Sequence, residues 1–455
     1  MPDPTSPLQE SDLIFSNAAS GWHDILGELK RSNLSISNRL RSIYDDAKFV
    51  KSVAEALKLP LIANERCGSW YIPPVLKAGS AYFKSTDGHH GQWAFSLRRL
   101  NLQVLDIIGA HDGCIIVDST RRGKSMPDAL SKTVPIWVTV LNRVLFPERT
   151  DAHALRTPPE VVSNSEHAQI DEQLPAFAAD LRSLTLDTAS LRSKLCNKPL
   201  QVQWLTPAQR PDADAGSANK NYHQIVLCTA SSSASSADPY VVASPDYVQG
   251  AADDSESWAL GLDAVSFWAH AAELLKTPGD DLPVVIGDLV SGQDKTIHII
   301  NPKLVKPTRN IFIANNASAR QHHHAFDLLI SCAAADKLIA GSSNGKYIQL
   351  VCRAGKLGSR DLRAQLSRLQ FISMLAKPDS KILISCDTGK DLAVGVALAI
   401  ICRLCNEHGD FDPGHELVSI GKTLIKHRLS WIMLSMPDAA PSRATLQSVN
   451  AYLMG

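Results

Sequence analysis

The chain has 455 residues, 44% of them hydrophobic and 20% charged, and its formal net charge is zero. This length exceeds one hydrophobic core and predicts two or more domains of a globular protein. The longest hydrophobic run, residues 392–402, is about half as long as a membrane-spanning helix, and residues 1–12 lack a signal-sequence pattern, so we expect no membrane partner. Nine scattered cysteines favour reduced thiols and a cytoplasmic location, with the nucleus as the alternative.

Charge is unevenly distributed along the chain. Residues 66–143 contain ten Lys/Arg against five Asp/Glu, and residues 295–390 contain fifteen against five. The balancing acids gather in residues 253–294, which have nine Asp/Glu and one Lys. Because a phosphate backbone responds to the local field, this segregation predicts a basic face that binds RNA; the alternative is that solvated helix faces carry these charges.

Several elements are predicted in the first 290 residues. Hydrophobic residues at helical spacing predict two amphipathic helices within residues 22–59. Residues 64–145 change to short strands and turn-rich loops, and residues 115–117 are a buried strand within them. Residues 151–193 are acidic and helical, while the small polar residues of 206–221 and 229–238 predict linkers.

After about residue 290 the pattern alternates between strands and helices. Strands are predicted at 297–300, 311–313, 347–352 and 381–385, and helices at 359–376, 391–405, 415–435 and 442–453. The alternation predicts an α/β fold, with a parallel sheet covered by helices in a C-terminal domain of residues 291–455. Residues 1–290 are expected to form an α+β catalytic domain.

The clearest local feature is a strand, a glycine-containing loop and a long hydrophobic helix in residues 381–405. Backbone N–H groups at such a helix start bind anions. The layout resembles the Cys-x5-Arg loop of protein tyrosine and dual-specificity phosphatases, but Leu392 stands where the phosphate-clamping arginine should be. We predict a loop that binds phosphate, with Lys390 as a substitute cation; the alternative is a buried structural cysteine. The predicted loop residues are Cys386, Asp387, Thr388, Gly389, Lys390 and Asp391.

Three N-terminal segments, 64–74, 82–101 and 114–137, are dense in polar and aromatic residues. Chemistry usually lies on loops held by a scaffold. In the third segment a buried strand leads to Asp118 and to hydroxyls and cations that suit a phosphate or diphosphate, and the carboxylate suits Mg²⁺. The aromatic residues are more typical of a core than of base stacking. The candidate substrate-binding residues are Lys84, Ser85, Thr86, Ser119, Thr120, Arg121, Arg122 and Lys124.

The chain resembles the initiator tRNA 2′-O-ribosyl phosphate transferases in these three segments. The matching stretches are NERCGSWYIPP (64–74), YFKSTDGHHGQWAFSLRRLN (82–101) and IIVDSTRRGKSMPDALSKTVPIW (115–137). The resemblance continues through ESWALGLDAVSFWAH (256–270) and ISCDTGKDLAVGVALAI (384–400), so it spans nearly the whole chain.

The resemblance implies a glycosyltransferase that moves 5-phosphoribosyl from phosphoribosyl pyrophosphate to the ribose 2′-OH of adenosine 64 in initiator tRNA. This tRNA modification keeps the initiator out of elongation. The C-terminal domain is expected to be like a dual-specificity phosphatase, and no obligate protein partner is expected. The alternatives are a phosphatase acting through Cys386 and a tRNA- or phosphate-binding protein without transferase activity.

The chemistry of this transfer suggests roles for the candidate residues. The leaving diphosphate needs positive charge, and Asp118 is expected to hold Mg²⁺ or the sugar hydroxyls. A base must take the proton of the attacking 2′-OH; Asp87 is the first candidate and His89 the second. The residues predicted to contact the diphosphate are Arg121, Arg122 and Lys124.

Two further sites remain open at this point. The C-terminal loop could hold the donor's 5-phosphate or a phosphate of the tRNA, and a loop at a helix start favours the donor because it completes a small closed site. The residues predicted to contact tRNA are Arg66, Arg98 and Arg99, although exposed arginines can equally be solvated.

Overall fold

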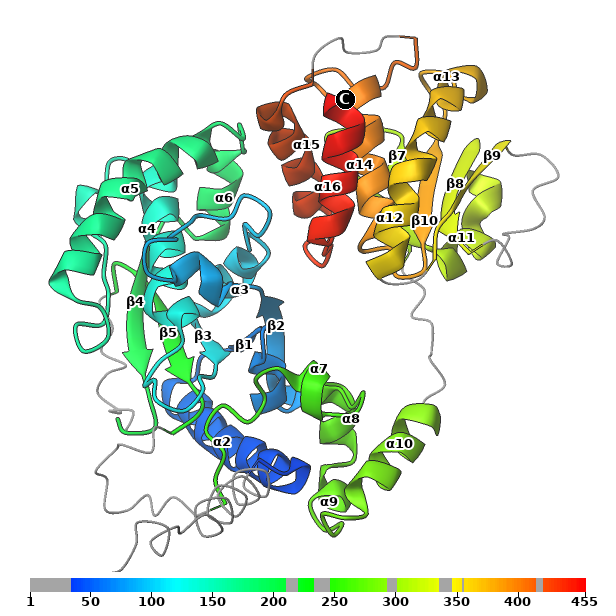
Figure 1. Cartoon of the computed structure of the whole chain (residues 1–455). Coiled ribbons are helices and arrows are strands. Elements are labelled where there is room, and N and C mark those ends of the chain that lie inside the picture. The colour runs from blue at the N-terminus through cyan, green and yellow to red at the C-terminus, as the bar shows by residue number, and fades with distance from the viewer. Residues whose placement is uncertain are drawn as a thin grey trace, which may run out of the picture.

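The computed structural model describes residues 34–209, 220–232, 246–292, 301–334, 346–353, 356–414 and 420–455. These residues form two lobes, which we call the N-terminal lobe (34–292) and the C-terminal lobe (301–455) (Figure 1). Each lobe is built on a five-stranded sheet.

The sheet of the N-terminal lobe has the strand order β2-β1-β3-β5-β4, and every neighbouring pair is parallel. Its strands are β1 (Leu61–Asn64), β2 (Lys77–Ala81), β3 (Gly113–Asp118), β4 (Leu200–Leu205) and β5 (His223–Thr229). The helices are α2 (Ile36–Leu57), α3 (Val104–His111), α4 (Val134–Leu145), α5 (Asn164–Arg182), α6 (Thr188–Lys194), α7 (Ser255–Trp258), α8 (Ala264–Ala269), α9 (Ala271–Leu274) and α10 (Leu282–Gly292).

Strand β3 shows how this sheet is covered on both faces. Every residue of β3 is buried, and its side chains alternate between the two faces. Cys114 and Ile116 pack into a core with α3, α4, α5 and α6. Ile115 and Val117 pack into a second core with α2 and α7 to α10. Burial on both faces is typical of a strand inside a parallel sheet, so this lobe has three layers.

The sheet of the C-terminal lobe has the order β6-β7-β10-β8-β9, and only the edge pair β6–β7 is antiparallel among the described strands. Its strands are β6 (Lys303–Leu304), β7 (Ile311–Asn315), β8 (Leu328–Ala333), β9 (Lys346–Val351) and β10 (Ile382–Cys386). The helices are α11 (Asn316–His322), α12 (Lys356–Gln365), α13 (Ile372–Leu375), α14 (Leu392–Leu404), α15 (Lys422–Ser435) and α16 (Arg443–Met454).

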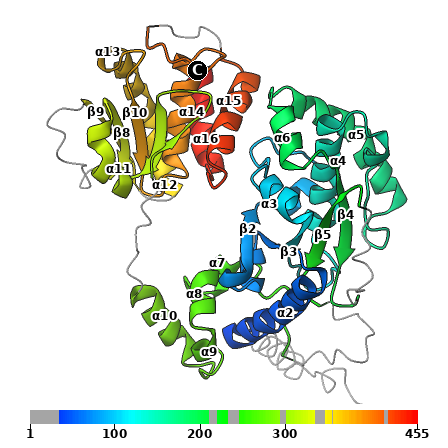
Figure 2. The same cartoon turned by 180° about the vertical axis from the view of Figure 1, so that it is seen from behind.

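The two faces of this second sheet are covered unequally. Ile382 and Ile384 of β10 face a large core with α12, α14, α15 and α16, and Figure 2 shows α14, α15 and α16 side by side. Leu383 faces a small cluster that includes Ala319 of α11. Helix α14 is buried along nearly its whole length because helices lie on one side of it and the sheet on the other. This explains its uniformly hydrophobic sequence.

The α/β class predicted from the sequence is confirmed. The finer description of the N-terminal part differs, because its sheet is parallel throughout, where the sequence predicted α+β. The strand β8 was not predicted, since its sequence LLISCA has no alternation to mark it. The predicted strand at 297–300, the first helix within residues 22–33 and most of both predicted linkers lie outside the described residues.

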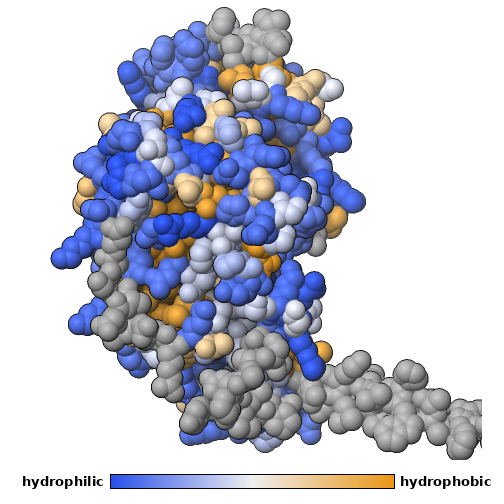
Figure 3. Space-filling view, turned by 90° about the vertical axis from the view of Figure 1, so that its left-hand side faces the viewer, coloured by the Kyte–Doolittle hydropathy of each residue, from blue (hydrophilic) through white to orange (hydrophobic). Residues whose placement is uncertain are grey.

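None of the helices in the described parts of the chain is long and hydrophobic enough to cross a bilayer. The face of the molecule shown in Figure 3 is mostly hydrophilic, with hydrophobic residues visible in small areas between polar ones.

A matched pair of glycine substitutions tests the packing of α14. An added Cβ at Gly395 would lie 2.6 Å from Cγ2 of Thr445, which is fully buried and whose hydroxyl donates to Asp391 at 2.6 Å. Because Thr445 is held in place, we expect Gly395→Ala to lower the free energy of unfolding by about 1–2 kcal/mol. The control is Gly287→Ala in α10, where an added Cβ meets nothing within 4 Å. Equal thermal unfolding curves for the two variants would contradict this packing.

Candidate functional site

The carboxyl ends of β1 and β3 lie side by side in the centre of the N-terminal sheet. The chain moves from β1 to β2 on one side and later returns to β3 on the other side of β1. Ligands of open α/β sheets usually bind at such a point, where the connections diverge. Asn64 ends β1 and Asp118 ends β3, so both residues lie at this position, and both are fully buried.

The Asp118 carboxylate is saturated by partners from the protein. Its Oδ1 accepts from Arg66 Nη2 at 2.9 Å, Cys67 Sγ at 3.0 Å and its neighbour's backbone N–H at 2.8 Å. Its Oδ2 accepts from Asn64 Nδ2 at 2.8 Å and from Arg66 Nε at 3.2 Å. Arg66 therefore binds the carboxylate side-on through two nitrogens, which is the strong, geometrically specific form of an ion pair.

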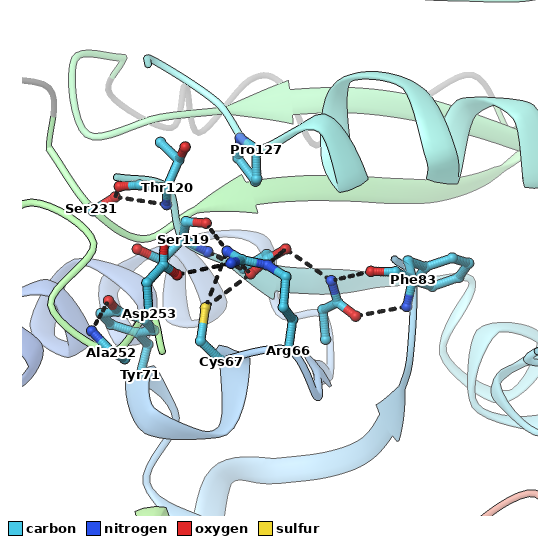
Figure 4. A network of polar contacts seen from close by, with 12 residues as sticks. Arg66, Cys67, Tyr71, Phe83, Ser119, Thr120, Pro127, Ser231, Ala252 and Asp253 are labelled. Atoms are coloured by element: carbon cyan, nitrogen blue, oxygen red, sulfur yellow. Dashed lines mark hydrogen bonds and ion pairs between the residues drawn. The ribbon is translucent and has the colours of Figure 1, made fainter. Parts of the chain in front are cut away.

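Arg66 also ties other parts of the lobe to Asp118. Its Nη1 donates to Asp253 at 2.9 Å and its Nη2 to the carbonyl oxygen of Ser119 (Figure 4). Burial alone would lower the pKa of Arg66, but the charges of Asp118 and Asp253 outweigh it and raise that pKa. The pKa of the Cys67 thiol is raised by burial and by Asp118, so this cysteine is a neutral hydrogen-bond donor. The sequence reasoning missed Asn64, Cys67 and Asp253.

The beginning of the loop after β3 is fixed by close packing. Thr120 donates its backbone N–H to Ser231 Oγ at 3.2 Å, and that hydroxyl donates back to the Thr120 carbonyl at 3.1 Å. Gly250 has φ of +67°, and an added Cβ would lie 2.5 Å from the carbonyl oxygen of Thr120. Only glycine fits there without displacing the loop. Ser119 and Thr120 are consequently buried, whereas residues 121–125 are exposed.

The second and third sequence segments lie against one another. Lys84, Ser85 and Thr86 belong to a short 3₁₀ turn region, and Thr133 Oγ1 donates to the carbonyl oxygen of Lys84 at 2.9 Å. An added Cβ at Gly88 would lie 2.6 Å from the carbonyl oxygen of Asp128. The structure therefore brings the turn carrying Asp87 and His89 next to the segment that follows the cationic loop.

A charged cluster joins these two segments, and its acidic members were not predicted. Asp128 pairs with Lys124 at 2.9 Å and with Lys132 at 3.1 Å, and His89 Nε2 lies 3.6 Å from it. Lys132 also pairs with Glu166 of α5 at 2.9 Å. The i,i+4 spacing of Asp128 from both lysines was the available sequence feature.

Both burial and neighbouring charges act on Asp87 and the arginines near it. Burial raises the pKa of Asp87, while Lys84, Arg99 and Arg98 act to lower it. Arg99 stacks on Tyr82, with its guanidinium 4.0 Å from the ring centroid, and burial lowers the pKa of Arg99. Arg98 is half-buried. A tRNA contact stays a prediction for Arg98 and Arg99, whereas the Arg66 guanidinium is already bound to Asp118 and Asp253.

The described residues do not fit a resident Mg²⁺ site at Asp118. Both oxygens of this carboxylate are hydrogen-bonded within the protein, and its side chain is fully buried. In the described parts of the chain no group of three or more His, Cys, Asp or Glu side chains is arranged to hold a metal ion. Mg²⁺ itself stays a prediction, whereas the predicted contact with Asp118 does not fit these hydrogen bonds.

The C-terminal loop has the strand–loop–helix geometry expected from the sequence. Cys386 ends β10 and is buried, and Gly389 has φ of +70°, where an added Cβ would lie 2.9 Å from the backbone of β7. Leu392 is buried at the start of α14, which has no side-chain cap. The loop therefore has no arginine clamp at the helix start.

The charged residues of this loop are engaged by the protein. Asp391 accepts hydrogen bonds from the Ser442 N–H at 2.8 Å and the Thr445 hydroxyl at 2.6 Å, so it anchors α16. Lys390 pairs with Asp438 at 3.2 Å. Asp387 and Thr388 are exposed, and Asp387 accepts from Asn316 Nδ2 at 2.9 Å. Backbone groups are thus the main donors that the loop offers to an anion.

Comparison with known proteins decides the family. Residues 29–291 match the family described as the Rit1 N-terminal domain, and residues 346–453 match the Rit1 DUSP-like domain. The chain is 34% identical to the tRNA A64-2′-O-ribosylphosphate transferase of Saccharomyces cerevisiae, over 94% of each chain.

The chain belongs to the Rit1 family.

Two further matches accompany this assignment. An uncharacterized protein of Schizosaccharomyces pombe is 42% identical, over 92% of this chain and 94% of that protein. The phosphatase domain of Yvh1 from Chaetomium thermophilum matches 33% of this chain and 94% of its own length, at 16% identity and a TM-score of 0.24. The Rit1 family assignment confirms the resemblance found in the sequence, including the phosphatase-like C-terminal part.

The Asp118–Arg66 pair of this Rit1 family member can be tested by unfolding. Asp118→Asn keeps the side-chain shape but leaves the guanidinium of Arg66 short of one counter-charge in a buried site. We expect the free energy of unfolding to fall by about 3 kcal/mol. Asp106→Asn, which removes an exposed carboxylate paired with Lys194, is the control and should cost under about 0.5 kcal/mol. Similar denaturation midpoints for the two variants would contradict a structural role for the pair.

Proposed function

We propose that this chain transfers 5-phosphoribosyl from phosphoribosyl pyrophosphate to the 2′-OH of adenosine 64 in initiator tRNA. The observation that supports it most is the near full-length similarity to a relative named tRNA A64-2′-O-ribosylphosphate transferase. The proposed action in translation is the one that the resemblance implies, exclusion of the initiator from elongation. The proposed location is the cytoplasm, and no protein partner is required.

The N-terminal site has the composition that a diphosphate donor needs. Arg121, Arg122 and Lys124 lie on an exposed loop whose first residues are fixed by Asp118, Arg66 and the Thr120–Ser231 hydrogen bonds. Cations on a rigidly anchored loop lose little freedom when they bind a polyanion. They also neutralise the charge that develops on a leaving diphosphate.

The proposed reaction is a substitution at the anomeric carbon of the donor. The 2′-oxygen of the tRNA ribose forms a bond to C1 of the phosphoribosyl group, and the bond from C1 to the diphosphate oxygen breaks. The diphosphate leaves with that electron pair, and the proton of the 2′-OH passes to a base of the enzyme. In this proposal Arg121, Arg122 and Lys124 stabilise the leaving group. What supports a base on the 3₁₀ turn Ser85–Gly88 is that His89, which follows the turn, and Lys124 both lie beside Asp128.

We propose that the C-terminal loop binds a phosphate without hydrolysing it. The uncapped start of α14 offers backbone N–H groups, while the N–H of Gly389 is already donated to the carbonyl oxygen of Cys386. Leu392 stands in place of the clamp that a phosphatase uses in the transition state. The donor's 5-phosphate is the first choice of ligand and a tRNA phosphate the second. Lys390 is held at Asp438, so it contributes less than the backbone.

The function is tested by label transfer. Phosphoribosyl pyrophosphate labelled in the ribose is incubated with initiator tRNA, with elongator tRNA and with an initiator lacking the 2′-OH at position 64. We expect label only in the intact initiator. Tight tRNA binding without transfer of label would show a binding protein instead, and equal labelling of elongators would refute the proposed specificity.

Charge removal on the cationic loop should act on donor binding. We expect Arg121→Ala combined with Arg122→Ala to raise the KM for phosphoribosyl pyrophosphate at least about tenfold, because each removes a charge-assisted hydrogen bond. Lys51→Ala on α2 removes an exposed cation that pairs with Glu55, and as the control it should leave that KM unchanged. Equal KM values for the two variants would remove the loop from the donor site.

The phosphatase alternative makes the opposite prediction at Cys386. We expect no turnover of p-nitrophenyl phosphate above background and unaltered label transfer in Cys386→Ser, because the loop lacks its arginine. Hydrolysis by the wild-type chain that Cys386→Ser abolishes would establish the phosphatase activity and contradict the proposed role of the loop.

A further inference from the structure

Asp128 is held in one position by three basic side chains. Its carboxylate is only 10% exposed; Oδ1 pairs with Lys132 at 3.1 Å, and Oδ2 accepts from Lys124 at 2.9 Å. His89 Nε2 lies 3.6 Å from the same Oδ2. Although burial acts to raise the pKa of Asp128, the hydrogen bonds and charges of Lys124 and Lys132 lower it, so the carboxylate is ionised.

The backbone around this contact is equally constrained. Asp128 immediately precedes a π-helical turn, Ala129–Thr133, and such turns are frequent at functional sites. The turn carrying His89 packs against it through Gly88, at which an added Cβ would be 2.6 Å from the Asp128 carbonyl oxygen. Thr133 fixes the other end of the same turn through the carbonyl of Lys84. The separation of His89 from Asp128 is therefore set by packing and not by two free side chains.

The imidazole of His89 faces the Asp128 carboxylate with one ring nitrogen, Nε2. About half of the His89 side chain is exposed, and among the described residues Asp128 is the one partner recorded for the ring. At 3.6 Å this contact is an electrostatic pair and not a hydrogen bond. A carboxylate beside one ring nitrogen still favours the tautomer that carries its proton there, which leaves the other nitrogen as the proton acceptor. Lys124 of the cationic loop reaches the same carboxylate oxygen, so the ring lies beside the residues assigned to the diphosphate.

We propose that Asp128 is a positioning residue, which holds His89 so that His89 Nδ1 takes the proton of the attacking 2′-OH. The inference rests on the proposed transfer reaction and goes beyond it by choosing the base. In the step, the 2′-O–H bond breaks and its proton bonds to Nδ1, while Nε2 keeps its own proton beside the Asp128 carboxylate, 3.6 Å away. The 2′-oxygen bonds to C1 of the donor, and the diphosphate leaves with its electron pair.

The choice of His89 over Asp87 rests on the carboxylate of Asp128 beside the imidazole. Burial raises the pKa of Asp87, although Lys84, Arg98 and Arg99 act to lower it, so the pKa of Asp87 does not by itself choose between the two bases. His90, the adjacent histidine, lies 3.7 Å from Glu166 and largely in solvent, so it is not turned toward Asp128. It provides a control at the neighbouring position.

The test is a double-mutant cycle on label transfer to initiator tRNA at saturating substrates. Asp128→Asn should lower kcat about 10- to 100-fold and His89→Gln at least as much, with both KM values within about twofold of wild type. In the His89→Gln background, Asp128→Asn should cause no further loss, because it acts through the imidazole. His90→Gln should leave kcat unchanged.

The melting temperature and kcat of a second variant distinguish a folding defect from the loss of a positioning role for Asp128. Asp128→Glu keeps a charge for Lys124 and Lys132 but displaces the carboxylate from the ring, so we expect a wild-type melting temperature and a kcat reduced at least about fivefold. Unchanged kcat in His89→Gln, or an equal loss from Asp128→Asn in both backgrounds, overturns the inference while leaving the transferase intact. Absence of label transfer by the wild-type chain would instead refute the proposed function and this inference with it.

Discussion

The buried ion pair between Asp118 and Arg66 is the interaction on which the N-terminal site depends. A fully buried carboxylate is stable only when a positive charge lies beside it and its lone pairs accept hydrogen bonds. Arg66 supplies the charge, and Asn64, Arg66, Cys67 and the backbone together donate five hydrogen bonds. The pair joins the ends of β1 and β3 to the Asp253 segment. This rigidity allows the next residues, 121–125, to be exposed on an anchored loop. Asp118 thus anchors this loop, and in our proposal its exposed neighbours make the ligand contacts.

The C-terminal lobe has the strand–loop–helix geometry of a phosphatase loop but lacks its arginine. Gly389 and the uncapped start of α14 remain, but Leu392 is packed into the core. Asp391 is hydrogen-bonded to α16, so the loop is anchored by its own acidic residue. Backbone N–H groups at a helix start can bind an anion without catalysing its hydrolysis. Such a loop is suited to holding a substrate while the chemistry takes place elsewhere.

Sequence reasoning found the elements with strong local patterns. Uniform hydrophobicity predicted strand β10 and helix α14, and the glycine between them predicted the loop at Cys386. The structure contains all three. Sequence reasoning could not find the partners of Asp118, because Arg66 and Asp253 are far from it in the sequence. They come into contact with Asp118 only after the parallel sheet has formed. The type of the N-terminal sheet was missed for the same reason: β1 and β2 are short, and their parallel pairing leaves no mark in the sequence.

Hydrogen–deuterium exchange with and without phosphoribosyl pyrophosphate tests most directly whether the anchored loop binds the donor. If the loop that follows the Asp118–Arg66 pair grips the diphosphate, exchange of the backbone amides in residues 121–125 slows when the donor is added, while α10 is unaffected. Unchanged exchange in residues 121–125 at a donor concentration that supports transfer would contradict the central claim.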